Sequence, residues 1–188
     1  QGALKAFEAG VDGLVVEGTE GGGFKGYEEI GLAVLIQAIK KEINLPIIAA
    51  GGIVNGIGMA SAFAAGAEAI QMGTRFVSSI ESPVHDNFKD SIKSAGTDGT
   101  YILNKSSKPV IRALKTDFTK DIYEKGSMNM GDLAKIKDLY FGGDMNAAPA
   151  LAGQSSGLIN EIKSVKNIID ETISEYNQVC LNLSKNLF

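Results

Sequence analysis

Three glycine-rich segments of this 188-residue sequence each follow a short apolar run, and their backbone amides could bind a phosphate group. They cover residues 21–23, 51–52 and 73–74. Glycine has no side chain to keep a ligand from the backbone, and Thr74 adds a hydroxyl donor. Glycine also loses more conformational freedom on folding than other residues, so a run of three is costly unless something must approach closely. We therefore expect a phosphate-bearing ligand, although any one segment alone could equally be a tight turn.

Strands and helices alternate around these segments. The apolar runs predict strands within residues 11–18 (VDGLVVEG), 45–50 (LPIIAA) and 67–73 (AEAIQMG), and helical spacing predicts helices within 3–10, 28–43 and 55–66. Glu28 and Glu29 would lie in the first turn of the second helix, where the helix dipole favours acidic groups. The helix after residues 51–52 would bring an N-terminus to the phosphate.

A repeated pattern indicates how the strands are connected. AFEAGVDGLVVEGT and AFAAGAEAIQMGT lie about 56 positions apart and share a helix, a glycine stop, an apolar strand and a terminal Gly-Thr. Such short units predict an α/β fold of parallel strands with right-handed crossovers, as in a (β/α)₈ barrel or an open doubly wound sheet. A whole barrel needs roughly 250 residues. We therefore expect the C-terminal portion of a TIM barrel, whose N-terminal half is missing or a separate chain.

The remainder of the chain is more polar. We expect residues 1–98 to form the barrel portion, 99–152 a small cap or inserted segment of turns and short helices, and 153–188 a closing helix and tail. Apolar residues at helical spacing in 157–176 predict that helix, with Leu158 at one end of its stripe.

Composition excludes several classes of function. A net charge of −4 and a pI of about 5.1 give no basic surface for nucleic acid or an anionic membrane. No apolar run approaches the roughly 18 residues that span a bilayer. The one cysteine, Cys180, cannot form an internal disulfide or a metal cluster and is typical of a cytoplasmic protein. A small-molecule partner is therefore expected, and the oligomeric state, a homodimer included, stays open.

Longer stretches carry a family resemblance. The segments LPIIAAGGI, GMASAFAAGAEAIQMGTRF and ESPVHDNFK resemble the flavin-dependent nitronate monooxygenase (2-nitropropane dioxygenase-like) family, which includes flavin-dependent enoyl-[acyl-carrier-protein] reductases. The resemblance implies a (β/α)₈ barrel that binds FMN. It places the FMN phosphate near Gly52 and residues 71–74, and the flavin ring along the loop of residues 17–23. The implied cofactor-binding residues are Glu17, Gly22, Gly23, Gly51, Gly52, Gln71, Met72, Gly73 and Thr74.

One position departs from that family. Its members usually have histidine directly after the glycines, where this chain has Phe24, and phenylalanine cannot transfer a proton. The catalytic residue is therefore unassigned. Glu17, where nitronate-oxidising members commonly have glutamine, slightly favours reduction of an enoyl thioester with NAD(P)H over oxidation of a nitronate.

Other polar residues have more ordinary roles in this interpretation. We expect His85 to act at a helix start, and Glu20 to bond backbone within its own loop. Two alternatives to an FMN oxidoreductase remain: a phosphate-binding barrel enzyme without redox activity, and a degenerate, non-catalytic relative.

Overall fold

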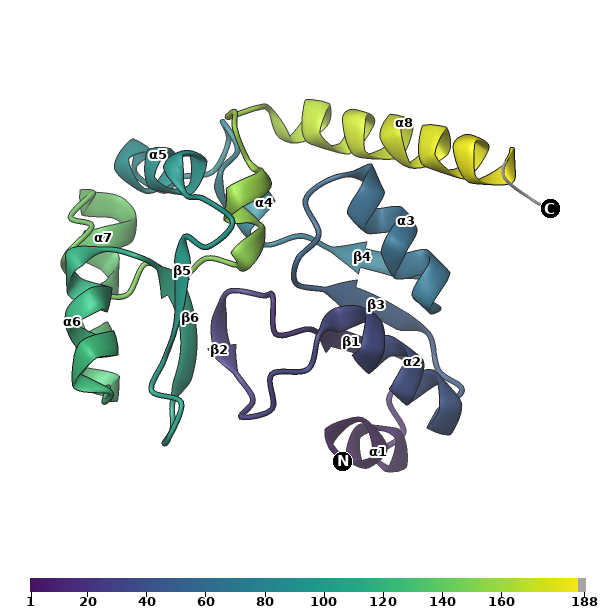
Figure 1. Cartoon of the computed structure of the whole chain (residues 1–188), viewed down its shortest axis with the longest axis horizontal. Helices are drawn as coiled ribbons and strands as arrows, with labels where there is room; N and C mark the ends of the chain where they lie inside the picture. Colours follow the sequence, from purple (N-terminus) through teal and green to yellow (C-terminus); the bar gives the residue numbers. More distant parts are fainter. Residues whose placement is uncertain (186–188) are drawn as a thin grey trace. The chain divides into compact units, whose positions relative to one another are not determined.

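The computed structural model describes residues 1–185, and contacts between residues divide the chain into two compact units (Figure 1). The first unit contains Gln1–Glu20, Glu29–Met72 and the chain from Lys166 on. The second contains Gly21–Glu28 and Gly73–Val165. Among residues 1–185, no helix combines the length and the apolar character needed to cross a membrane.

A parallel sheet forms the centre of the first unit. Its strands are β1 (Leu14–Glu17), β3 (Ile47–Ala50) and β4 (Ala69–Gln71), in the order β1-β3-β4. Helix α2 (Leu32–Glu42) packs on β1 and β3, and α3 (Gly56–Ala65) packs on β4 and beside α2 (Figure 1). The short helix α1 (Gly2–Glu8) precedes β1. The three predicted strands, their parallel direction and the α/β class are confirmed.

Apolar side chains between this sheet and its helices form the core of the first unit. Ile36 of α2 and Ile47 of β3 are fully buried, and Leu14 and Val16 of β1 join them from alternate positions. Burial of each such side chain contributes on the order of 2 kcal/mol. Val15, between the two buried β1 residues, is 55% exposed, so the other face of the sheet is not covered at β1.

Helix α2 begins later than predicted. Residues 28 and 29 precede it, and Gly31 is the extended N-cap residue before Leu32. The carbonyl of Ile30 accepts a hydrogen bond from the amide of Thr19 at 2.9 Å, which ties this segment to the chain after β1. The helical spacing of apolar residues is correct, but this loop contact delays the first turn.

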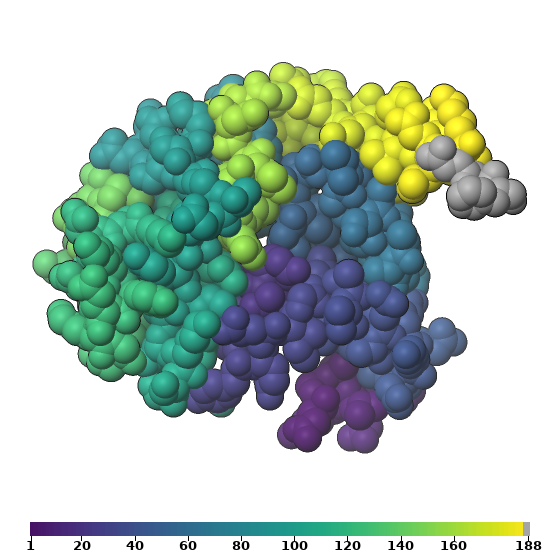
Figure 2. All heavy atoms as spheres, in the orientation of Figure 1, coloured from purple at the N-terminus to yellow at the C-terminus, as the bar shows by residue number. Residues whose placement is uncertain are grey.

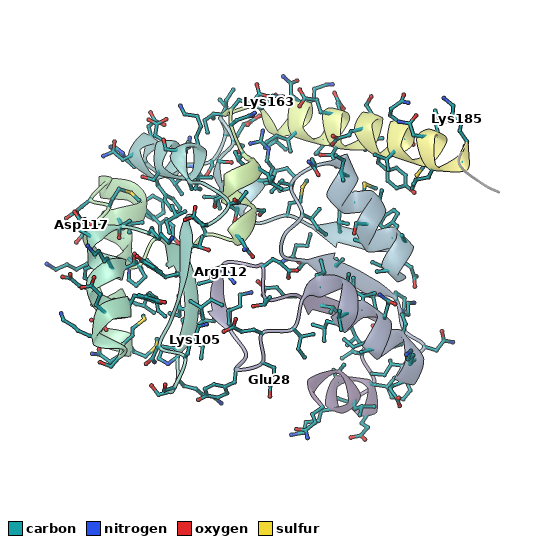
Figure 3. The ribbon with its side chains drawn as sticks, viewed as in Figure 1. Glu28, Lys105, Arg112, Asp117, Lys163 and Lys185 are labelled. Carbon is teal, nitrogen blue, oxygen red and sulfur yellow. The ribbon has the colours of Figure 1, made fainter. Side chains whose placement is uncertain are left out.

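An antiparallel sheet, which the sequence did not predict, forms part of the second unit. Its order is β2-β6-β5, from β2 (Gly23–Lys25), β6 (Val110–Leu114) and β5 (Thr100–Leu103). Figure 3 labels Lys105, in the turn after β5, and Arg112 on β6. The prediction of only turns and short helices for 99–152 is therefore wrong in part, because β5 and β6 pair as a hairpin whose β6 residues are all buried.

Short helices precede and follow that sheet along the sequence, and those within residues 99–152 agree with the predicted short helices. They are α4 (Thr74–Val77), α5 (Asp86–Ser94), α6 (Asp117–Lys125), η1 (Met130–Leu133), α7 (Ile136–Gly142) and η2 (Gln154–Leu158). The core of this unit includes the fully buried Leu103 and Ile111 from the two long strands, with Ile122 of α6 against them.

The closing helix, α8 (Val165–Ser184), is also shorter at its start than predicted. Leu158 lies in η2 and is 57% exposed, so it does not belong to the helical stripe. The helix begins where the Glu81 carboxylate accepts hydrogen bonds from the Val165 amide, at 2.9 and 3.0 Å. Ile168 and Thr172 are its buried residues. In Figure 2 the atoms of this helix change from yellow-green to yellow along the chain.

Candidate functional site

The parallel register brings five of the predicted site residues to one edge of the first unit's sheet. Glu17 pairs with Ala50, and Ala50 pairs with Gln71, so the three strands end side by side. The carboxyl edge of parallel strands is where α/β proteins bind their ligands. The residues that reach it are Glu17, Gly51, Gly52, Gln71 and Met72.

The loop after β3 offers hydrogen-bond donors for an anion. Gly51 and Gly52 have φ values of +87° and +77°, a left-handed conformation that side chains rarely permit. Within residues 1–185, no group accepts a hydrogen bond from the amides of Gly52 and Ile53. Two adjacent backbone N–H groups at this edge fit a phosphate, whose oxygens accept such bonds. Sequence analysis missed Ile53, because the glycines themselves were the only visible signal.

The N-termini of α2 and α3 are already bonded to side chains of the chain itself. The Leu32 amide of α2 donates to both carboxylate oxygens of Glu20, at 3.2 Å. The Gly56 amide of α3 donates to Glu175 of α8 at 2.7 Å, and the Gly58 amide donates to Asn55 at 3.0 Å. These three helix amides are therefore already engaged within the chain, unlike the loop amides of Gly52 and Ile53.

From the sequence we expected Glu20 to bond backbone within its own loop. Instead, its carboxylate reaches a helix that starts 12 residues later. A cavity of about 160 Å³ lies beside it, lined by Gly51, Gly52 and Ile53 as well as by residues of α2 and α3. The carboxylate thus joins the chain after β1 to the wall of a pocket that includes the glycine loop.

Two predicted residues of the second unit meet at Gly153. A Cβ added to Gly22 would lie 2.6 Å from the Gly153 nitrogen and 2.5 Å from the Ala152 carbonyl carbon. The Gly153 amide also donates to Thr74 Oγ1 at 2.9 Å. Gly22 is therefore required for close approach of two backbone segments of the chain itself, which is a structural reason for part of the glycine run. Gly73 has open space where its Cβ would stand.

The loop predicted at Gly23 and Phe24 is instead a strand. Gly23 has a φ of +80°, and Phe24 pairs with Ile111 of β6 with 54% of its surface exposed. Arg112, opposite Gly23, is buried and donates to Thr100 Oγ1 at 2.8 Å. Position 24 is thus fixed in a sheet while its side chain remains accessible.

His85 has the structural role that we predicted. It is the N-cap of α5, and its Nδ1 accepts a hydrogen bond from the Asn87 amide at 3.1 Å. A Cβ on Gly143 would lie 2.6 Å from the His85 ring, so that glycine makes room for the imidazole. Tyr140, whose carbonyl accepts from the His85 amide, has a pKa raised by burial to about 12.

Comparisons with known proteins identify the relatives of this chain. A family model described as nitronate monooxygenase matches residues 1–175. A nitronate monooxygenase of Paraburkholderia phytofirmans is 34% identical over 126 residues, covering 63% of this chain and 34% of the relative. The (3aS,4S,5R,7aS)-5-hydroxy-7a-methyl-1-oxo-octahydro-1H-indene-4-carboxyl-CoA dehydrogenase of Rhodococcus jostii is also 34% identical over 126 residues, covering 67% of this chain and 35% of the relative. The chain therefore spans about a third of the length of these two proteins.

Solved structures match almost the whole chain. FabK from Thermotoga maritima matches with a TM-score of 0.92 and 38% identity, over 98% of this chain and 60% of that one. Nitroalkane oxidase from Streptomyces ansochromogenes matches with a TM-score of 0.82 and 23% identity, over 96% of this chain and 56% of that one. The second match supports the fold alone.

Proposed function

The chain belongs to the nitronate monooxygenase family, and from this membership we propose that it is part of an FMN-dependent oxidoreductase. Flavin-type oxidoreductase chemistry is common to the family and to its structural neighbours. The observation that carries the proposal is the carboxyl edge of the parallel sheet, where the Gly52 and Ile53 amides offer donors that fit a phosphate. FMN, when bound, supplies the redox chemistry.

We propose further that the chain is the C-terminal portion of a TIM barrel. It covers 60% of the FabK chain, and β1 is an edge strand with Val15 exposed. A groove of about 400 Å³ between α1, β1 and α2 lies along that edge. Parallel strands are normally buried on both faces and paired on both edges within a barrel. Preceding strands of the same protein, in the same chain or in a separate one, would pair with β1 and fill this groove.

The proposed FMN ligands are the residues that the family resemblance assigned, together with Ile53. Gly51 and Gly52 keep side chains away from the phosphate, and the Gly52 and Ile53 amides donate to it. Thr74 adds a hydroxyl and Gly73 an unobstructed backbone, and Gln71 and Met72, at the end of β4 and directly after it, complete the proposed set. Glu17, Gly22 and Gly23 are proposed contacts of the flavin ring.

We favour reduction of an enoyl thioester by NAD(P)H as the reaction. FabK is an enoyl-[acyl-carrier-protein] reductase, and its 38% identity extends over 98% of this chain. Phe24 also lacks the proton-transfer capacity of the family's usual histidine. Nitronate oxidation is the second candidate, because of the family match and the 34% identity to a nitronate monooxygenase.

An anaerobic reduction experiment on the full-length protein tests these proposals. The purified protein should show the visible absorption of a bound flavin, and NADH or NADPH should bleach it in the absence of oxygen. Adding an enoyl thioester should then restore the colour. A colourless protein that takes up no FMN would contradict the flavin proposal. A yellow protein that neither nucleotide bleaches, but that a nitronate does, would replace the reductase by the second candidate.

A further inference from the structure

Glu20 is a carboxylate that caps a helix from a distant position in the chain. The N-cap residue of α2, Gly31, has no side chain that could accept a hydrogen bond. Glu20 takes that function by accepting from the Leu32 amide, at 3.2 Å to each oxygen. An acidic group at a helix N-terminus is stabilised both by this bond and by the helix dipole.

Glycines leave the space that the Glu20 side chain occupies. A Cβ on Gly18 would overlap the Glu20 carboxylate and would lie 2.6 Å from Leu32. A Cβ on Gly31 would lie 3.4 Å from Glu20 Oε1. A side chain at position 18 would push the carboxylate out of its place, whereas a Cβ at position 31 would only touch it. The backbone around Glu20 is therefore arranged for this one side chain.

The carbon chain of Glu20 also lies against the loop that we propose binds phosphate. The Cβ position on Gly52 would be 3.1 Å from Glu20 Cβ and 3.4 Å from its Cγ, but 3.9 Å from its carboxyl carbon. The apolar part of Glu20 thus supports the left-handed Gly52, while the carboxylate turns toward Leu32. Both residues line the same cavity of about 160 Å³.

In this geometry Glu20 has two opposite effects on the binding of a phosphate. Its negative charge would repel a phosphate nearby, although the bond to the α2 amide partly offsets that charge. Its hydrogen bond and its packing would hold the Gly52 and Ile53 amides in one conformation, which lowers the entropic cost of binding. A neutral side chain of the same shape should keep the hydrogen bond and the packing, but it should not repel the phosphate.

We propose that Glu20 is a positioning residue, which holds the loop after β3 in the conformation that binds a phosphate by tethering it to the N-terminus of α2. This inference rests on the proposed FMN function for its ligand. It adds a role that acts through the backbone of residues 51–53 and does not require Glu20 to touch FMN.

Three substitutions and two ligands test the proposal in the full-length protein. Glu20→Ala removes the tether, and Glu20→Gln keeps an oxygen that can accept from Leu32. Glu81→Ala is the matched control, because Glu81 caps α8 through the Val165 amide in the same way. Flavin fluorescence quenching gives the Kd of each variant for FMN and for riboflavin, which has no phosphate. Amide hydrogen exchange of the flavin-free protein reports on Leu32 and on residues 51–53.

We expect Glu20→Ala to raise the Kd for FMN about tenfold, which corresponds to the loss of roughly one hydrogen bond to a charged group. The Kd for riboflavin should stay within about twofold of the wild-type value. Glu20→Gln should bind FMN at least as tightly as the wild type. Exchange should rise at Leu32 and at 51–53 in Glu20→Ala only. Equal losses for FMN and riboflavin, a loss in Glu20→Gln, or the same loss in Glu81→Ala would overturn the proposal.

The two proposals fail in different ways. If the wild type binds neither flavin, the FMN function fails, and hydrogen exchange still tests the tether. If Glu20→Ala binds FMN normally, or leaves exchange at 51–53 unchanged, the tether fails while the FMN function stands.

Discussion

The hydroxyl of Thr74 accepts a hydrogen bond from the amide of Gly153, at 2.9 Å. A hydroxyl has one hydrogen to donate, and accepting from an amide leaves that hydrogen available. The contact also fixes the position of the oxygen at the start of α4. Thr74 could therefore donate this hydrogen to a phosphate oxygen, which fits the FMN-binding role that the family resemblance implies for it.

Replacement of Thr74 tests whether its hydroxyl donates to the phosphate of FMN. Thr74→Val keeps the shape but removes both the acceptor for Gly153 and the donor, so we expect FMN to bind about 10- to 100-fold more weakly. Thr74→Ser retains the hydroxyl and should bind FMN within a fewfold of the wild type. Fluorescence titration measures both constants. Equal affinity of the valine and serine variants would remove Thr74 from the proposed ligand set.

Gly22 should be intolerant of any side chain for reasons of packing. In Gly22→Ala the new Cβ would stand 2.5 Å from the Ala152 carbonyl carbon, and backbone cannot move aside as a flexible side chain can. We expect a loss of about 1–3 kcal/mol in the free energy of unfolding, measured by urea denaturation. Gly26→Ala is the control on the other side of β2, since its nearest neighbour would be at 3.8 Å. It should change stability by no more than about 1 kcal/mol. Similar losses in both variants would indicate a general effect of alanine beside β2.

The parallel sheet was predictable because its signals are local. β1, β3 and β4 are apolar runs with glycines close after them, and the next element of the chain is a helix after β3 and β4, whereas β2 lies between β1 and α2. Parallel strands joined by such short crossovers must end at one edge, so the grouping of Glu17, Gly52 and Gln71 followed from the chain order. The stop of α3 at Gly66 was predictable for the same reason, because its left-handed φ of +113° favours glycine.

The antiparallel sheet was not predictable from such signals. β2 has only three residues, and Phe24 pairs with Ile111, which lies far along the chain. A strand this short shows no alternation of its own, and a distant partner decides its conformation. The same applies to the Glu20 cap of α2, because the sequence around Leu32 contains no sign of a carboxylate that arrives from another loop. Contacts of this kind moved the starts of α2 and α8 away from the predicted residues.

The raised pKa of Tyr140 predicts that the folded protein loses stability at alkaline pH. Burial raises its pKa from 10 to about 12, while the unfolded chain ionises near 10. The folded state therefore holds a proton that the unfolded state has lost, and this contribution is complete below about pH 10 and disappears as pH rises toward about 12. Its full size is about 2–3 kcal/mol. Denaturation followed by circular dichroism at about pH 9 and pH 11 should show a smaller decrease in Tyr140→Phe than in the wild type. An equal decrease in both proteins would contradict the assignment.

Phe24→His should increase the oxidation of nitronates. Position 24 is held by pairing with Ile111, and its side chain is 54% exposed, so an imidazole there would be solvated and titrate near its usual pKa of about 6.5. A positioned base contributes roughly 10²–10⁴-fold to a proton transfer, and we expect kcat/KM for a nitronate to rise by at least about tenfold. Oxygen consumption measures this rate, which should grow as pH rises through the pKa of the new histidine. Phe24→Leu removes the aromatic ring without adding a base, so a gain in that variant would attribute the effect to space rather than to proton transfer. A histidine variant no faster than the leucine variant at any pH would mean that residue 24 does not reach the reacting atoms.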